Sequence, residues 1–148
     1  MDQEDYLIRQ ISQLGRVLGK ILTGLLGIKT SGQSNSGIEA ANHELKNELG
    51  LTFDELAFMP FASFIQKFPL AGKLNCDNFE MLADIFFLLA EELTESELDI
   101  KKRKKLLERS LAILEYIENT SLVYSVERNL KMDRIKLALK NNYSGKPG

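Results

Sequence analysis

A hydrophobic repeat near the N-terminus is the feature that most restricts how this chain can fold. Between residues 3 and 28, apolar side chains recur at alternating spacings of four and three residues. The repeat consists of Leu7, Ile11, Leu14, Leu18, Ile21, Leu25 and Ile28. This alternation keeps every member on one stripe of an α-helix, whereas a strand would distribute them over both faces. Because Arg9, Arg16 and Lys20 fall on the opposite side, we predict a long amphipathic helix over 3–28.

Glycines at positions 15, 19, 24 and 27 lie within this predicted helix, although each lowers helix stability by about 1 kcal/mol. In a membrane-spanning helix such small residues would form the contact face itself. Here all four avoid the leucine and isoleucine stripe and lie on its flanks or beyond. The uncharged run after Lys20 is also much shorter than the ~20 residues needed to cross a bilayer. We therefore expect a helix held by its stripe, with glycines that let a neighbour approach its sides.

The rest of the chain reads as shorter helices separated by polar or proline-containing breaks. The stretch 29–37 is rich in Gly, Ser and Asn, and we predict a flexible loop there. Thr52 and Glu55 have the spacing of a capping box, which starts a helix that Pro60 must end. We expect helices at about 37–49, 52–59, 61–69, 75–93, 94–118 and 121–139.

The segment 75–93 has apolar residues around most of its helical circumference, so we expect it to be the central helix. The phenylalanines between 53 and 68 are expected to join the core. For the last two helices we predict the buried positions to be Leu107, Leu111 and Leu114, followed by Val123, Val126, Leu130 and Leu137.

These elements predict one all-α domain over 1–139, built as an antiparallel helical array. Strand-forming runs of Val and Thr are few, and 44% hydrophobic residues suffice for a globular core. The array would occupy 38–139 behind the N-terminal helix and the 29–37 loop. We expect 140–148, which ends in Ser-Gly-Lys-Pro-Gly, to be a disordered tail.

The single histidine and the single cysteine offer little chemistry. His43 lies away from the apolar face of its helix, without a converging partner, so we interpret it as an exposed surface residue. Cys76 stands beside Asp77, and no second cysteine or histidine lies near it in sequence. A carboxylate neighbour opposes thiolate formation, so we interpret Cys76 as structural or incidental.

Five consecutive basic residues form the strongest charge feature: Lys101, Lys102, Arg103, Lys104 and Lys105. One interpretation is a patch that binds phosphate, nucleic acid or anionic lipid. The other is a solvated stretch of helix, because Glu97 and Asp99 precede Lys101 and Arg103 by four residues, the favoured order for helical ion pairs. We favour the solvated stretch.

Composition and motifs exclude several function classes. A net charge of −2 gives no basic field to gather nucleic acid. The sequence contains no Gly-rich phosphate loop, no His-Glu-x-x-His and no Gly-x-Ser-x-Gly. We therefore expect no catalytic residues, no metal and no cofactor. The acidic start predicts no secretory signal, and one cysteine fits a reducing compartment, so we expect a cytoplasmic protein.

Residues Phe79-x-x-Leu82-Ala83-x-x-Phe86 resemble the first helix of a tetratricopeptide repeat. In such repeats the small residue lets the second helix approach, while the large residues fill the space beside it. The resemblance covers about 75–139 and is degenerate, because Glu127 stands at a position where a small residue is usual. It implies right-handed helix pairs in the C-terminal half.

The opening Asp5-Tyr6-Leu7-Ile8-Arg9 resembles the start of a family of small all-helical bacterial proteins. The resemblance covers mainly the N-terminal helix and the general layout. It implies a bacterial, cytoplasmic, all-α protein and transfers no functional residue.

These observations favour a non-enzymatic interaction or scaffold module that binds a protein or a peptide. Its partner or dimer seam would be the stripe residues Leu7, Ile11, Leu14, Leu18, Ile21 and Leu25. The same stripe could equally serve packing within the chain, and a homodimer is an open alternative. A second hypothesis is a peripheral membrane protein whose N-terminal helix lies in the interface. An enzyme is a third hypothesis, which clustered titratable residues in a concave site would support.

Overall fold

The computed structural model describes residues 3–31, 34–66, 76–91, 93, 97–121 and 123–143. Within these residues the chain forms seven α-helices and no strand, which confirms the all-α prediction. The helices are α1 (Gln3–Ser31), α2 (Ser34–Leu49), α3 (Phe53–Phe58), α4 (Phe61–Gln66), α5 (Cys76–Glu91), α6 (Glu97–Thr120) and α7 (Val126–Tyr143).

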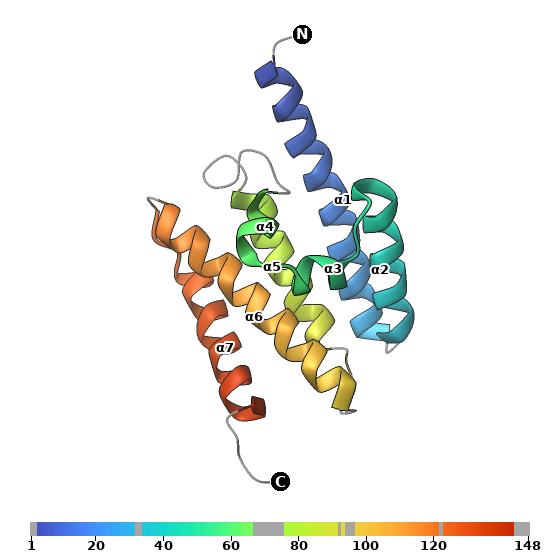
Figure 1. The fold of residues 1–148 in the computed structure, drawn as a ribbon, viewed down its shortest axis with the longest axis vertical. Coiled ribbons are helices and arrows are strands. Elements are labelled where there is room, and N and C mark those ends of the chain that lie inside the picture. The colour runs from blue at the N-terminus through green and yellow to red at the C-terminus, as the bar shows by residue number, and fades with distance from the viewer. Residues whose placement is uncertain are drawn as a thin grey trace.

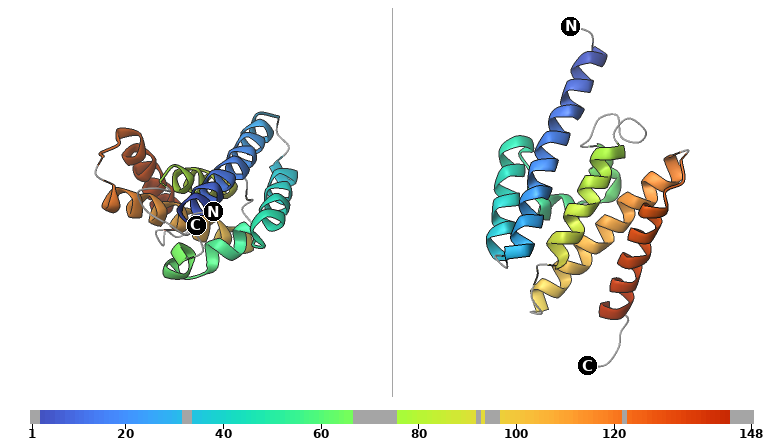
Figure 2. Two further views of the ribbon diagram at one scale, coloured as in Figure 1. Left: turned by 90° about the horizontal axis from the view of Figure 1, so that it is seen from above. Right: turned by 180° about the vertical axis from the view of Figure 1, so that it is seen from behind.

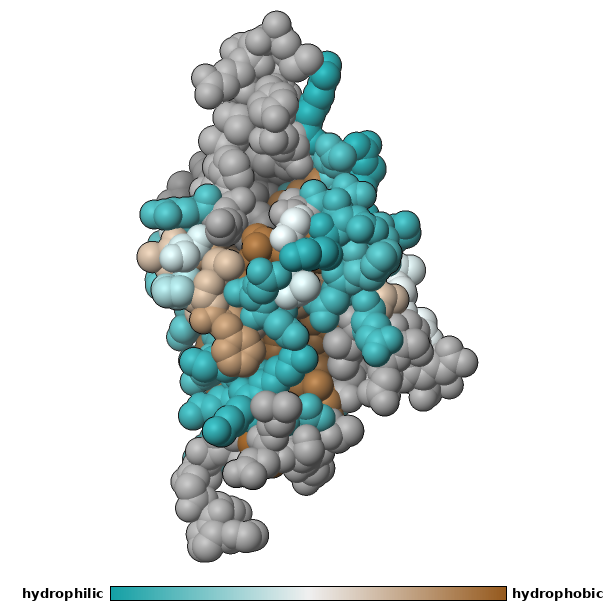
Figure 3. Space-filling model, turned by 45° about the vertical axis from the view of Figure 1, so that its right-hand side comes forward, coloured by the Kyte–Doolittle hydropathy of each residue, from teal (hydrophilic) through white to brown (hydrophobic). Residues whose placement is uncertain are grey.

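The long helices form a series in which each packs on the next, in the order α2, α1, α5, α6, α7 (Figure 1). Helix α5 stands in the middle, between α1 and α6, as its apolar circumference predicts. The short helix α3 bridges α2 and α6. On the face drawn in Figure 3, the described surface is mostly polar, and a narrow apolar strip shows between the polar side chains.

The stripe of α1 is used inside the chain over its C-terminal half. Leu18, Ile21 and Leu25 are buried in the core, and Leu14 packs against it half-buried. The side chains of the two remaining seam positions, 7 and 11, lie outside the described residues. At ~1.5 Å per residue, the 29 residues of α1 span about 44 Å, against about 24 Å for the 16 of α5. The first turns of α1 therefore project past the ends of α2 and α5 (Figures 1 and 2).

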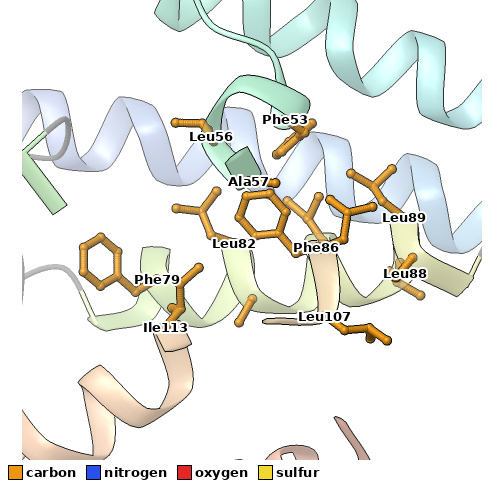
Figure 4. Packing of buried hydrophobic residues seen from close by; sticks show 14 of the residues in the cluster. Phe53, Leu56, Ala57, Phe79, Leu82, Phe86, Leu88, Leu89, Leu107 and Ile113 are labelled. Carbon is orange, nitrogen blue, oxygen red and sulfur yellow. The ribbon is translucent and has the colours of Figure 1, made fainter. Parts of the chain in front are cut away.

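Aromatic rings join α3 and α4 to the central helix. Figure 4 shows Phe53, Leu56 and Ala57 of α3 lying over Leu82 and Phe86 of α5. The rings of Phe53 and Phe86 meet edge to face, with centroids 5.7 Å apart, a favourable aromatic geometry. The predicted aromatic core is thus confirmed at Phe53 and Phe64; Phe58 is instead exposed, and residue 68 lies outside the described residues.

The ends of α3 are fixed by the predicted cap and by a buried arginine. The Glu55 amide donates to Thr52 Oγ1 at 3.2 Å, while the Thr52 amide donates to Glu55 Oε1 at 3.0 Å, so the capping box is confirmed. At the other end, the Arg109 guanidinium of α6 donates to the carbonyls of Ala57 and Met59. These contacts hold α3 against α6.

Two predicted boundaries are wrong because polar residues continue helices rather than ending them. The loop expected over 29–37 is helical at 29–31 and again from Ser34, since Ser and Asn are favoured helix starters as well as loop residues. Helix α7 continues through Lys140 to Tyr143, because no glycine or proline occurs between Val126 and Gly145. Residues 144–148 of the expected tail lie outside the described residues.

The prediction for the last helix is wrong in its start and in its buried face. Helix α7 begins at Val126, where Ser125 Oγ accepts a hydrogen bond from the Arg128 amide. The buried residues are Arg128, Met132 and Ile135. The residues expected in the core are exposed: Val123, Val126, Leu130 and Leu137. The prediction for α6 is better, with Leu107 and Leu114 buried and Leu111 half-buried.

Only one glycine of α1 meets a close neighbour. A Cβ atom added at Gly15 would lie 2.8 Å from Asn78 Oδ1 of α5, and Asn78 is buried. At Gly19, Gly24 and Gly27 an added Cβ would have no atom within 4 Å. The expected close approach is therefore confirmed at Gly15 alone.

This difference predicts opposite effects of alanine along α1. Gly19→Ala and Gly24→Ala should each raise the free energy of unfolding by up to ~1 kcal/mol, because alanine is the better helix former. Gly15→Ala should leave it at or below the wild-type value, because its methyl group must displace a buried amide. Urea denaturation measures all three, and an equal gain at every position would contradict the close approach.

Candidate functional site

A groove of about 350 Å³ lies between α1 and α7, with α5 and α6 as its floor. Figure 2 (right) shows α5 between α1 and α7 in the view from behind. We call this the α1/α7 groove. Its lining residues are Leu22, Leu26, Asp84, Phe87, Leu88, Glu91, Ser110, Leu114, Glu127, Lys131, Arg134 and Ile135.

The floor of the groove is the side of α5 that its neighbours leave uncovered. Asp84, Phe87, Leu88 and Glu91 have helical spacings of three, four and seven residues and so share one face. A second hollow of about 280 Å³ shares Phe87 and Glu91 with the groove and extends it toward Arg103 of α6. The concave surface therefore runs along the C-terminal half of this face of α5, from Asp84 to Glu91.

The α1 wall of the groove is apolar. Leu22 is half-buried against the core, and Leu26 is 50% exposed. Both lie beside the buried stripe, so they are apolar positions in excess of what α1 needs to pack on α5. Neither leucine belongs to the stripe of α1 that the sequence predicts. A surplus apolar pair four residues apart on the flank of a stripe is the signal that could have located this wall.

The α7 wall is held in place by Arg128, a buried cation. Its guanidinium donates through Nε to Glu80 Oε1 of α5 at 2.9 Å and through Nη1 to Glu118 Oε1 of α6 at 3.0 Å. Asn129 Nδ2 donates to the other oxygen of Glu118 at 2.6 Å. Because the Arg128 side chain is 7% exposed, little water shields these pairs. They fix the rotation of α7 and thereby choose which of its faces lines the groove.

The α7 wall carries charges of both signs. Lys131 Nζ lies 3.1 Å from Asp84 Oδ1 across the groove floor and 3.7 Å from Glu127 Oε1 on its own helix. Burial raises the pKa of Asp84 above its ordinary value of 3.8, and the hydrogen bond from Lys131 offsets this only in part. Arg134 lines the same wall and is exposed. The groove is thus apolar on the α1 side and charged on the α7 side.

Ser110 has a structural role at the back of the groove. Its Oγ donates to the Ala83 carbonyl at 2.7 Å, and both residues are buried where α6 crosses α5. A small residue on each helix permits this close approach, as the sequence predicts for Ala83. The hydroxyl is therefore not presented as a nucleophile. Within the described residues, no group of three or more His, Cys, Asp or Glu side chains is arranged to hold a metal ion.

The basic run does not form one surface. Lys102 Nζ lies 3.0 Å from Asp54 Oδ2 of α3. The Arg103 guanidinium donates to the carbonyls of Ala90, at 3.2 Å, and Leu93, beyond the end of α5. Lys101, Lys104 and Lys105 are exposed. Two of the five residues thus serve contacts between helices, and only Arg103 borders the concave surface.

His43 and Cys76 lie away from the groove. His43 is exposed, and its Nε2 lies 3.3 Å from Asn47 Nδ2 of the next helical turn. Burial raises the pKa of the Cys76 thiol above its ordinary value of 9.0, so the thiolate is disfavoured. Both observations support the interpretations made from the sequence.

The buried ion pairs predict a large effect at Arg128. Arg128→Met keeps an unbranched apolar stem but leaves Glu80 and Glu118 without their cation, and we expect the free energy of unfolding to fall by about 2–4 kcal/mol. Lys131→Met, which removes a pair nearer to solvent, should cost less than about 1 kcal/mol. Urea denaturation compares the two. Equal losses would show that Arg128 does not anchor α7.

The raised pKa of Asp84 predicts a pH-dependent gain for Asp84→Asn. Because the folded chain holds the Asp84 proton more tightly than the unfolded chain, wild-type stability falls as pH rises through the interval between the two pKa values. The variant should match the wild type near pH 4 and exceed its free energy of unfolding near neutral pH. Urea denaturation across this range tests it, and a variant less stable than wild type at neutral pH would contradict it.

Three further observations bear on the class of protein. Among the helices of the described residues, none combines the length and the apolar character required to cross a bilayer. Four of the predicted seam residues have described side chains: Leu14, Leu18, Ile21 and Leu25. They face the chain's own core rather than the groove. No protein-family model, curated protein sequence or solved structure matches this chain.

Proposed function

We propose that the protein is a non-enzymatic interaction module that binds an amphipathic helix of a protein partner in the α1/α7 groove. The observation that carries the proposal is the asymmetry of the groove, with Leu22 and Leu26 on one wall and Lys131 and Arg134 on the other. An amphipathic helix laid along α5 would place its apolar face against the first wall and a polar edge against the second.

The size of the groove suits a few anchoring side chains. A volume of about 350 Å³ lies at the lower end of the range for ligand pockets. Leu88 and Phe87 form an apolar floor, while Leu26 leaves half of its surface open for contact. Large apolar side chains of a partner would gain most by covering Leu26 and the half-buried Phe87, because Leu88 is already buried.

Charge indicates which helix would fit best. Lys131 is already engaged with Asp84, whereas the exposed Arg134 stands at the open edge of the wall. A partner carboxylate opposite Arg134 would form an ion pair at the rim. Such rim pairs contribute mainly to specificity and association rate. We therefore expect a partner helix with apolar anchors on one face and an acidic residue beside them.

Two features support binding rather than catalysis. The groove carboxylate nearest the floor, Asp84, is held by Lys131, and the Ser110 hydroxyl is held by the Ala83 carbonyl. Neither group has an adjacent imidazole within the described residues, where His43 lies on α2. The degenerate tetratricopeptide-like pattern in α5 agrees with this proposal, because helix-pair arrays commonly bind peptides or helices in a groove.

The membrane alternative has less support. Leu18, Ile21 and Leu25 would have to leave the core before the C-terminal half of α1 could lie in a bilayer interface. On the outer face of α1, Lys20 is paired with Glu44 of α2 at 3.2 Å. A peripheral membrane role would therefore have to rest on the first turns of α1.

Site-specific photo-crosslinking tests the groove. A photoreactive phenylalanine analogue replaces Leu26 or Glu91 in the groove, or the exposed Glu48 of α2 as a control, in cells that express the protein. We expect one partner segment to be crosslinked from both groove positions and not from the control. Crosslinks of equal yield from all three would contradict a specific groove.

A binding titration then decides whether the groove holds that segment. A synthetic peptide of the crosslinked segment is titrated against the wild type, Leu26→Glu and the control Glu48→Ala. We expect Leu26→Glu to weaken binding by about 10-fold or more, because a carboxylate replaces a desolvated apolar anchor, and Glu48→Ala to bind as the wild type does. Unchanged affinity in Leu26→Glu would overturn the proposal.

A further inference from the structure

The outer face of α7 exposes a row of large apolar side chains. Val126, Leu130 and Leu137 are 62%, 60% and 58% exposed. Val123 and Tyr124, in the turn just before the helix, are 71% and 70% exposed. Isolated exposed leucines are ordinary, but a row of five large residues on one terminal element marks an interaction surface.

Helical geometry places this row directly opposite the buried face. At ~100° per residue, Val126, Leu130 and Leu137 fall within about 40° of one another, while Ile135 lies about 160° away from their centre. The burial of Arg128 and Ile135 agrees with this arrangement. Val126, Leu130 and Leu137 therefore form a stripe on the side of α7 away from α5 and α6, with the exposed carboxylate of Asp133 at its edge. Val123 and Tyr124 precede the helix and extend the exposed row. We call it the α7 stripe: Val123, Tyr124, Val126, Leu130 and Leu137.

The α7 stripe is unusual for the last helix of an array. The uncovered face of a helix in such an array is normally polar. A further helix laid against the α7 stripe would complete the packing.

We propose that the occupant is α7 of a second copy of this chain, packed antiparallel about a two-fold axis that passes beside Leu130. The spacing of the stripe supports this arrangement. Leu137 follows Leu130 by two helical turns, and Val123 and Tyr124 lie in the turn that precedes Val126, so a two-fold at Leu130 brings Leu137 toward that turn of the partner subunit. Leu130 meets its own copy, as residues on an isologous axis do.

The charges beside the stripe are complementary in the same register. A two-fold perpendicular to the helices brings the same flank of each helix together. Glu127 and Arg134 share one flank of the stripe, three residues before and four residues after Leu130. Each would therefore face the other residue of the partner subunit, giving two symmetric ion pairs. Both side chains are exposed, and Glu127 makes only a long contact of 3.7 Å with Lys131.

This surface is distinct from the seam that the sequence suggested. The described part of the α1 stripe is already buried in the core, so it cannot form a dimer without partial unfolding. The α7 stripe is exposed in the folded chain and needs no such change. The observations that support self-association do not rest on the proposed function of the α1/α7 groove.

Sedimentation equilibrium on the full chain tests the proposal. We expect the wild type to form a dimer and Leu130→Glu to be a monomer, because its carboxylates would meet on the two-fold axis. Circular dichroism melting shows whether the variant folds, which is expected since Leu130 is exposed. Leu26→Glu is the control, at a leucine that is 50% exposed and lies outside the stripe, and it should remain a dimer.

Charge reversal tests the antiparallel register. Glu127→Arg and Arg134→Glu should each weaken the dimer by about 10-fold or more, because like charges then face each other. The double variant restores both pairs with reversed sign and should recover the wild-type dissociation constant. A monomeric wild type, a dimer that survives Leu130→Glu, or a double variant no better than the singles would each overturn the proposal. Loss of the dimer in Leu26→Glu alone would instead place the interface at the groove.

Discussion

The buried guanidinium of Arg128 is the contact on which both proposed interaction surfaces of this chain depend. It joins α7 to Glu80 of α5 and Glu118 of α6, so three helices meet at one charge. A buried cation of this kind must keep its partners, since losing them costs several kcal/mol. Keeping both ion pairs restricts the rotation of α7 about its own axis. That rotation places Lys131 and Arg134 on the groove and leaves the α7 stripe outside.

The sequence predicted those elements whose local pattern and tertiary role agree. The stripe of α1, the apolar circumference of α5 and the Thr52–Glu55 capping box each follow from near neighbours in the chain. Helix α7 shows the opposite case. Its most apolar face is not its buried face, because Arg128 is buried against the half-buried carboxylates of Glu80 and Glu118, which leaves Leu130 and Leu137 exposed. A hydrophobic pattern cannot reveal this, since the carboxylates lie on other helices.

The groove could not be derived from the sequence for a related reason. Its two walls and its floor come from four helices. The groove exists because α7 packs on α6 and leaves one face of α5 open. The sequence did show the excess of apolar residues on α5 and on the flank of α1. It did not show which of these apolar residues would be covered by other helices of the same chain. The basic run shows the opposite situation, in which residues that look like a binding patch are used inside the chain. Lys102 contacts α3, and Arg103 contacts the end of α5.

The two proposed interactions share residues, which has a thermodynamic consequence. Glu127 and Arg134 line the α1/α7 groove and also flank the α7 stripe. A groove partner that pairs a carboxylate with Arg134 would compete with Glu127 of the partner subunit for the same guanidinium. Because linkage is reciprocal, each interaction would then weaken the other by the same factor. The chain would hold its partner best as a monomer, and self-association would act as the resting state of the free protein.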